Sequence, residues 1–211
     1  MLAKAIQFAA KKHEYQERKF TGEDYINHPI QVMLGVLNDP VYGSNDFAAA
    51  VAILHDVIED CGSSREAMYL EIDEKFGPGI ASAVYALTNE YTSERHPQLN
   101  RQERKAREVK RLAKLDDLEK TIKAYDRLAN LKDTLANLKD TLACSKEEFK
   151  FARKYSLESI ELAKALITDE NKKLIQSLLC YIMLILKFDP EQDETITEAV
   201  SLTGKYYRDL N

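Results

Sequence analysis

The chain has 211 residues, a length that predicts one domain or at most two small ones, with a core large enough to fold without cross-links. Hydrophobic residues make up 45% and charged residues 31%, which are ordinary proportions for a soluble globular protein. The net charge of −5 and the isoelectric point of about 5.5 argue against a general nucleic-acid-binding protein. They still allow a local basic pocket for a phosphorylated small molecule.

Few residues break helices, since the chain has only seven glycines and five prolines, and alternating strand patterns are weak. Pro29 suits a first helical position and should keep His28 outside the α region, so a helix is expected to begin at Pro29. In chain order we expect helices near residues 2–13, 29–37, 46–60, 64–75, 80–89, 101–142 (one or two), 146–167, 171–186 and 195–209.

The heptapeptide LANLKDT occurs at residues 128–134 and again at 135–141. Seven residues are nearly two helical turns, so the duplicated unit keeps its face and forms a leucine seam. The first interpretation is a duplication that lengthens one helix; the second is a surface for a partner helix.

The cysteines Cys61, Cys144 and Cys180 are far apart and odd in number, which favours a reducing cytoplasm. The N-terminal segment has no secretory signal pattern. The most apolar stretch, residues 174–188, is too short to span a bilayer and is expected to be a buried helix.

Four polar side chains end the apolar segment at residues 48–60: His55, Asp56, Glu59 and Asp60. Spacings of three and four residues place them close together at one helix end. Carboxylates buried together repel each other, and a divalent cation removes that cost. The alternative is a frayed acidic helix end in water, which fits poorly with the negative end of the helix dipole.

Four ordered segments carry a resemblance to a known family: Gln16–Lys19 with Gly22 and Tyr25–Pro29, His55–Asp60, the pairs Phe76-Gly77 and Leu87-Thr88, and Ile122–Leu131. In them the sequence resembles the HD-domain phosphohydrolases, and within these the RelA/SpoT-type alarmone hydrolases. The resemblance covers about residues 1–160.

This resemblance implies an all-α HD-domain bundle of about eight to ten helices. It implies one domain over residues 1–211, with the metal-site core at about 1–160 and C-terminal helices at 161–211. It also implies that Mn²⁺, or another divalent ion, is bound by His28, His55, Asp56 and Asp126. Glu59 and Asp60 would then orient the attacking water and move protons.

The substrate contacts implied by the resemblance are Arg18, Lys19, Asn130 and Tyr155. Arg18 and Lys19 could instead form a solvated turn, and Tyr155 could belong to the core. A basic run at residues 101–114 is expected to be mostly a solvated helix face, although some of its side chains could reach a polyphosphate.

The function implied is hydrolysis that removes the 3′-pyrophosphate from (p)ppGpp. The expected partner is a small nucleotide substrate, with no nucleic acid and no membrane, and the protein could form homo-oligomers. In that family a lysine commonly follows the Leu-Thr pair, whereas this chain has Asn89-Glu90-Tyr91. Two alternatives therefore stay open. One is hydrolysis of another phosphorylated nucleotide, such as NADPH or a nucleoside phosphate, and the other is a metal- and nucleotide-binding sensor without turnover.

Overall fold

A computed structural model describes residues 1–18, 22–62, 64–140, 145–189 and 193–210. These residues form helices, with one isolated antiparallel bridge between Glu17 and Asp24, so the all-α prediction is confirmed. The chain divides into two compact units, Met1–Asp126 and Arg127–Asn211. A single domain over residues 1–211 stays a prediction, and each unit is described by itself.

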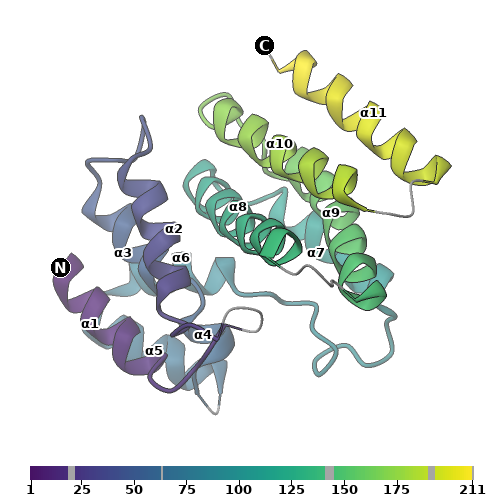
Figure 1. Ribbon diagram of the computed structural model, residues 1–211. Helices are drawn as coiled ribbons and strands as arrows, with labels where there is room; N and C mark the ends of the chain where they lie inside the picture. The colour runs from purple at the N-terminus through teal and green to yellow at the C-terminus, as the bar shows by residue number, and fades with distance from the viewer. Residues whose placement is uncertain (19–21, 63, 141–144, 190–192, 211) are drawn as a thin grey trace. The chain divides into compact units, whose positions relative to one another are not determined.

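The first unit is built around a helix that is fully buried from residue 48 to residue 54. Its helices are α1 (Leu2–Lys12), α2 (Asn27–Leu37), α3 (Asp46–Leu54), α4 (Val57–Asp60), α5 (Arg65–Phe76), α6 (Pro78–Leu87), α7 (Arg101–Leu112) and the start of α8 (Asp117–Asp140). Residues 48–54 of α3 have no exposed surface, and α3 packs against α1, α2 and α6 (Figure 1). An apolar helix enclosed on all sides gives its C-terminal end a fixed position.

The expected helix at residues 46–60 is interrupted, which corrects the prediction of one continuous element. α3 ends at Leu54, and Asp56 has φ −96° and ψ −7° before α4 begins. In an unbroken helix neighbouring side chains point in directions about 100° apart. The interruption instead brings His55 Nε2 and Asp56 Oδ2 to 3.0 Å. Apolar patterning alone could not locate this break.

The helix expected to begin at Pro29 in fact begins at Asn27, so the expectation that His28 lies outside it is wrong. The His28 N–H donates to the Tyr25 carbonyl at 3.0 Å, and the Ile30 N–H donates to Ile26 at 3.1 Å. Pro29 lies in the first turn, where its missing N–H costs little. These bonds outweigh the weak steric preference of a residue that precedes proline.

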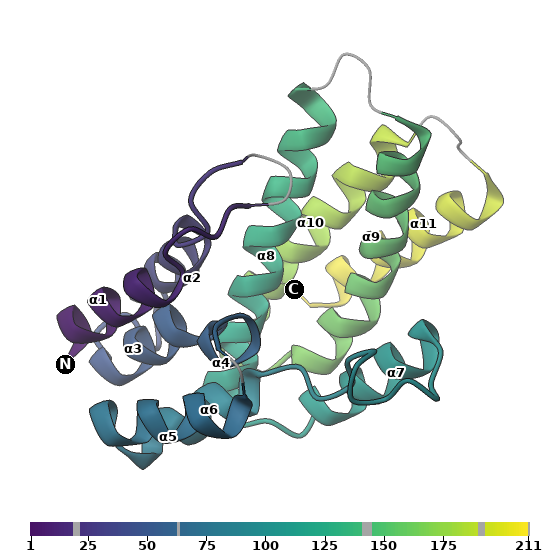
Figure 2. The ribbon, with the colours of Figure 1, turned by 90° about the horizontal axis from the view of Figure 1, so that it is seen from below.

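The second unit contains α8 from Arg127 onward, α9 (Lys146–Leu166), α10 (Lys172–Phe188) and α11 (Glu194–Asp209). α10 packs against α9 and α11 (Figure 2). The prediction of a buried helix near residues 174–188 is confirmed, with Ile175, Leu178 and Leu179 fully buried. Within the part of the chain that is described, no helix has both the length and the apolar character needed to cross a bilayer.

The LANLKDT duplication contributes to the buried side of α8. Leu128, Leu131, Leu135 and Leu138 are between 0% and 7% exposed, while Leu142 lies outside the described residues. Buried leucines favour the helix-lengthening interpretation over a surface for a partner helix.

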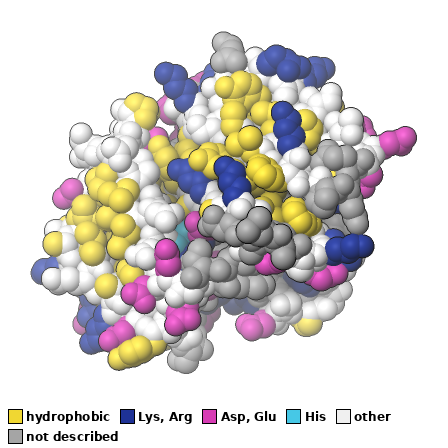
Figure 3. Space-filling view, viewed as in Figure 1, with side chains coloured by type: hydrophobic (Ala, Val, Ile, Leu, Met, Phe, Trp, Pro, Cys, Tyr) yellow, Lys and Arg dark blue, Asp and Glu magenta, His cyan; other side chains and the backbone are white. Residues whose placement is uncertain are grey.

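On the face shown in Figure 3, basic and acidic side chains are interspersed.

Replacing Gly35 by alanine is expected to lower the free energy of unfolding by about 1–3 kcal/mol. A Cβ at Gly35 would lie 2.5 Å from Cδ1 of Tyr125, and the Tyr125 hydroxyl donates to Asp39 Oδ2 at 3.0 Å, which restrains the ring. Denaturant unfolding measures the change. The matched control is Gly204→Ala in α11, where the nearest atom is 3.6 Å away and alanine should stabilise the helix by about 0.5–1 kcal/mol. Equal stabilisation by both substitutions would contradict the close packing at Gly35.

Candidate metal centre

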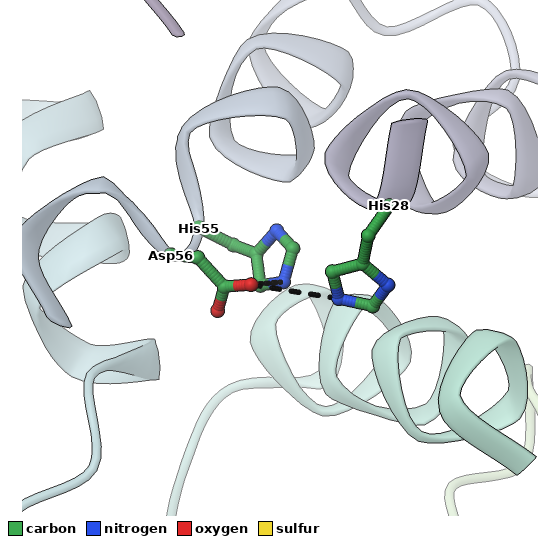
Figure 4. A group of neighbouring side chains, drawn as sticks. All are labelled: His28, His55 and Asp56. Carbon is green, nitrogen blue, oxygen red and sulfur yellow. Dashed lines mark ion pairs between the residues drawn. The ribbon is translucent and has the colours of Figure 1, made fainter. Parts of the chain in front are cut away.

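Four side chains from three parts of the first unit lie close together: His28 on α2, His55 and Asp56 at the α3–α4 break, and Asp126 on α8. Their exposed fractions are 2%, 1%, 9% and 7%. One ligand atom each from His28, His55 and Asp56 lies within 4.8 Å of the others, and Figure 4 shows these three side chains pointing toward one another. The packing around α3 therefore gathers residues that are far apart in sequence.

The donor atoms are spaced as a small coordination site requires. Asp56 Oδ2 lies 3.0 Å from His55 Nε2 and 3.5 Å from His28 Nε2. Asp126 Oδ1 lies 3.2 Å from His28 Nε2 and 3.8 Å from His55 Nε2. Two imidazole nitrogens and two carboxylate oxygens are donors that several divalent ions accept.

The protonation of His55 makes this cluster suitable for a cation. Its Nδ1 lies 2.8 Å from the Ala52 carbonyl oxygen, so Nδ1 carries a proton and donates. Its buried Nε2 has no hydrogen-bond partner among the described atoms and faces the Asp56 carboxylate. A lone pair facing a carboxylate oxygen at 3.0 Å is repulsive unless a proton or a metal ion lies between them. The residues therefore fit a divalent cation.

Without a metal ion, a proton takes that place. Burial lowers the pKa of His55, but the negative charges of Asp56 and Asp126 outweigh burial and raise the pKa to about 10. Burial raises the pKa of both carboxyl groups. The charge of His55 nevertheless holds the pKa of Asp56 below its ordinary value, and the charge of Lys123, with a hydrogen bond from His28, does the same for Asp126.

Two neighbours of the cluster were not among the predicted site residues, although both lie in the segments that carry the resemblance. Lys123 Nζ lies 2.8 Å from Asp126 Oδ2, which leaves Oδ1 directed at the histidines. The Tyr25 hydroxyl is 2.9 Å from Asp56 Oδ2 and 2.7 Å from Asp60 Oδ2. Lys123 holds the second oxygen of Asp126, whereas Tyr25 contacts the Asp56 oxygen that also faces the histidines. Groups that contact a carboxylate in these ways can orient it toward a metal ion.

Replacing Tyr25 by phenylalanine is expected to weaken divalent-cation binding about tenfold, because Asp56 loses a hydrogen bond that orients it. The ring, which stacks on His13 with centroids 4.9 Å apart, is kept. Titration calorimetry with Mn²⁺ measures the affinity. Tyr15→Phe is the control, since Tyr15 is 93% exposed. Equal affinities of the two variants would show that the Tyr25 hydroxyl does not orient Asp56.

Glu59 and Asp60 lie at the solvent-exposed edge of the cluster. Glu59 Oε2 accepts the Asn89 N–H at 2.9 Å, and Asp60 contacts Tyr25. Partial burial of each carboxyl group removes some of the water around it, and this is the main reason that the pKa of each is raised. Cys61, next in sequence, is buried, and burial raises the pKa of its thiol to about 11. That thiol is therefore protonated at neutral pH.

The predicted substrate contacts are placed differently. The Arg18 guanidinium lies 5.5 Å from the centroid of the Tyr25 ring, beside the cluster, while Lys19 lies outside the described residues. Asn130 and Tyr155 belong to the second unit, where Arg127 lies over the Tyr155 ring at 4.4 Å. Roles for all four in substrate binding stay predictions.

Comparisons with known proteins show the family to which the chain belongs. A family model described as an HD domain matches residues 5–150. The guanosine-3′,5′-bis(diphosphate) 3′-pyrophosphohydrolase MESH1 of Drosophila melanogaster is 34% identical over 128 residues, which are 60% of this chain and 65% of that protein. MESH1 of Xenopus tropicalis is 32% identical over 134 residues, 63% of this chain and 68% of that one. The chain thus spans about two thirds of these relatives.

A longer relative and a solved structure extend the comparison. The guanosine-3′,5′-bis(diphosphate) 3′-pyrophosphohydrolase of Aquifex aeolicus is 38% identical over 87 residues, only 11% of its length. A solved structure of a metazoan orthologue of SpoT that hydrolyses ppGpp matches with a TM-score of 0.56. The match covers 100% of this chain and 96% of the chain in that structure, with 22% sequence identity. A similarity at this level shows the fold alone.

Proposed function

The chain belongs to the HD-domain family, and on that premise we propose that it is a metal-dependent phosphohydrolase that removes the 3′-pyrophosphate from (p)ppGpp-like alarmones. The observation that carries the proposal is the convergence of His28, His55, Asp56 and Asp126 on one point. The relatives that match over about two thirds of their length carry that activity in their names, which supports the choice of substrate.

Those four residues would hold one divalent cation, and the mixed imidazole and carboxylate donors suit Mn²⁺. A bound divalent cation lowers the pKa of water enough to supply hydroxide at neutral pH. Asp126 keeps one oxygen for the cation because Lys123 holds the other. His55 keeps Nε2 for the cation because Nδ1 donates to Ala52.

Glu59 and Asp60 orient the attacking water and carry its proton away. Both lie at the open edge of the cluster, and a pKa raised by burial makes each carboxylate a stronger base. Arg18 and Lys19 would face the nucleotide or its phosphates, and Asn130 and Tyr155 stay predicted substrate contacts. A cytoplasmic location belongs to the same proposal, supported by free Cys61 and Cys180.

A second candidate is hydrolysis of another phosphorylated nucleotide such as NADPH. It is favoured by the segment Asn89-Glu90-Tyr91, because the alarmone hydrolases commonly have a lysine within a few residues of the Leu-Thr pair and this segment carries an acidic residue instead. Replacing a positive charge by a negative one near the site would change which phosphate pattern is accepted.

Purified protein with Mn²⁺ should be offered ppGpp, NADPH and a panel of nucleoside phosphates, with released phosphate and pyrophosphate identified. Pyrophosphate from ppGpp supports the first candidate, and phosphate from NADPH or another donor supports the second. Tight nucleotide binding without product would contradict both and would leave a sensor.

A further inference from the structure

The Glu59 carboxylate is held by a backbone group from a distant segment. The Asn89 N–H donates to Glu59 Oε2 at 2.9 Å, across 30 residues of sequence. Asn89 lies just beyond α6, in a stretch without regular secondary structure. The direction of this N–H, and with it the position of the carboxylate, therefore depends on what holds residues 88–91.

Two arginines hold this segment by its carbonyl groups. Arg111 Nη1 donates to the Ala86 carbonyl at 2.7 Å, and Arg111 Nη2 donates to the Thr88 carbonyl at 3.1 Å. Arg65 Nη2 donates to the Asn89 carbonyl at 2.6 Å. The Asn89 residue is thus bonded at both its N–H and its C=O, which leaves little freedom to rotate either peptide plane.

Glu108 holds the other side of the segment. This carboxylate is 6% exposed, and Oε2 accepts the N–H groups of Glu90 at 3.2 Å and Tyr91 at 3.3 Å. Oε1 accepts from Arg111 Nε at 3.1 Å and Nη2 at 2.6 Å. A buried charge pair such as Glu108–Arg111 adds little to stability, because the cost of desolvation offsets the attraction. Its charge-assisted hydrogen bonds nevertheless hold the two side chains and the bonded backbone groups in one arrangement.

Ordinary helix capping does not account for the whole network. Arg111 caps the last carbonyls of α6, a common structural role. Glu108 and Arg65 act further along, at residues 89–91, where the Asn89 N–H is bonded to the Glu59 carboxylate at the edge of the cluster. The network therefore connects α5 and α7 to the edge of that cluster.

We propose that Arg65, Glu108 and Arg111 form a positioning frame that aims the Asn89 N–H at Glu59 and so fixes the carboxylate that orients the attacking water. The three are positioning residues, since they act through Asn89 and do not reach the water. The proposal rests on the proposed function of Glu59. It also gives a structural use to part of the basic run at residues 101–114, which was expected to be mostly solvated.

The test compares Arg111→Lys with Arg107→Lys, an exposed position on the same helix. Lysine keeps the charge but cannot make the forked contacts to Ala86, Thr88 and Glu108. We expect Arg111→Lys to lower kcat about tenfold, with KM and Mn²⁺ affinity nearly unchanged. By NMR hydrogen exchange, the Asn89 amide should exchange about tenfold faster than in the wild type, and Arg107→Lys should change neither quantity.

A double-mutant cycle with Glu59→Gln separates positioning from general loosening. If the frame acts through Glu59, Arg111→Lys should cost little further activity once Glu59→Gln is present. If the activity losses of the two single variants instead multiply in the double variant, the proposal is overturned. Arg65→Lys, which removes the forked donor to the Asn89 carbonyl, replaces Arg111→Lys if that variant does not fold.

Exchange at Asn89 is read without substrate, so it separates this proposal from the proposed function. Unchanged exchange in the lysine variants would refute the frame even in an active enzyme. Faster exchange in a protein that hydrolyses none of the nucleotides would support the frame geometry and refute the proposed function alone.

Discussion

Replacing Asp56 by asparagine is expected to lower kcat/KM for the hydrolysed nucleotide by roughly 10³-fold, because a divalent cation contributes several kcal/mol and each factor of ten is about 1.4 kcal/mol. Asp56 Oδ2 lies against both His55 and His28 and accepts from Tyr25, so it is central to the donor set. An amide lacks the charge that attracts the cation. Steady-state hydrolysis in excess Mn²⁺ measures the loss.

The matched control is Asp117→Asn, whose side chain is 52% exposed at the start of α8 and which should keep wild-type activity. Circular dichroism of both variants establishes that helices are retained. A folded Asp56→Asn protein with more than about a tenth of wild-type kcat/KM would show that the reaction does not depend on this cluster.

The second large effect is a pH dependence that changes when metal is added. The folded pKa of His55, about 10, lies above its ordinary 6.5. Its protonation therefore stabilises the metal-free protein fully below pH 6.5, and this contribution is lost as pH rises through about 10. The pKa values of Asp56 and Asp126 lie below the ordinary 3.8, so their stabilising contributions are already complete above that value.

A metal ion at His55 Nε2 must displace this proton, so binding releases it and apparent metal affinity should rise about tenfold per pH unit below the His55 pKa. The rise in melting temperature caused by Mn²⁺, relative to a chelated sample, should therefore grow between about pH 6.5 and about pH 8.5. Comparing the two samples at each pH cancels groups that titrate elsewhere. A metal-induced shift that is the same at every pH would contradict displacement of the His55 proton.

Periodicity and glycine and proline content were enough to predict an all-α fold and the approximate helix ranges. They failed at residues 55–56, where the apolar pattern is continuous but the backbone is not. A run of apolar residues predicts that a segment is buried. It does not predict the backbone conformation at the end of the segment, because that depends on the elements that pack against it. The break is also what brings His55 and Asp56 to the same point, so the missed feature belongs to the proposed metal centre.

The site residues were predicted from two kinds of sequence signal, residue spacing and family resemblance. Spacing alone reached His55 and Asp56, with Glu59 and Asp60 beside them, whereas His28 and Asp126 depended on the resemblance. Contacts between distant segments were out of reach. The charge pattern predicts that Glu108 and Arg111 belong to a solvated basic face. Their contacts with residues 86–91 form only in the folded chain, so the sequence pattern does not reveal them.

The most direct test of the account is Mn²⁺ titration of the metal-stripped wild type and of Asp126→Asn, followed by calorimetry and by metal analysis after dialysis. Asp126 approaches both histidines and is itself held by Lys123, so its loss opens the donor set while the packing is preserved. We predict one Mn²⁺ per wild-type chain and none retained by the folded variant. A wild type that binds no divalent cation, or a variant that binds as tightly as the wild type, would contradict the assignment of these four residues as a metal centre.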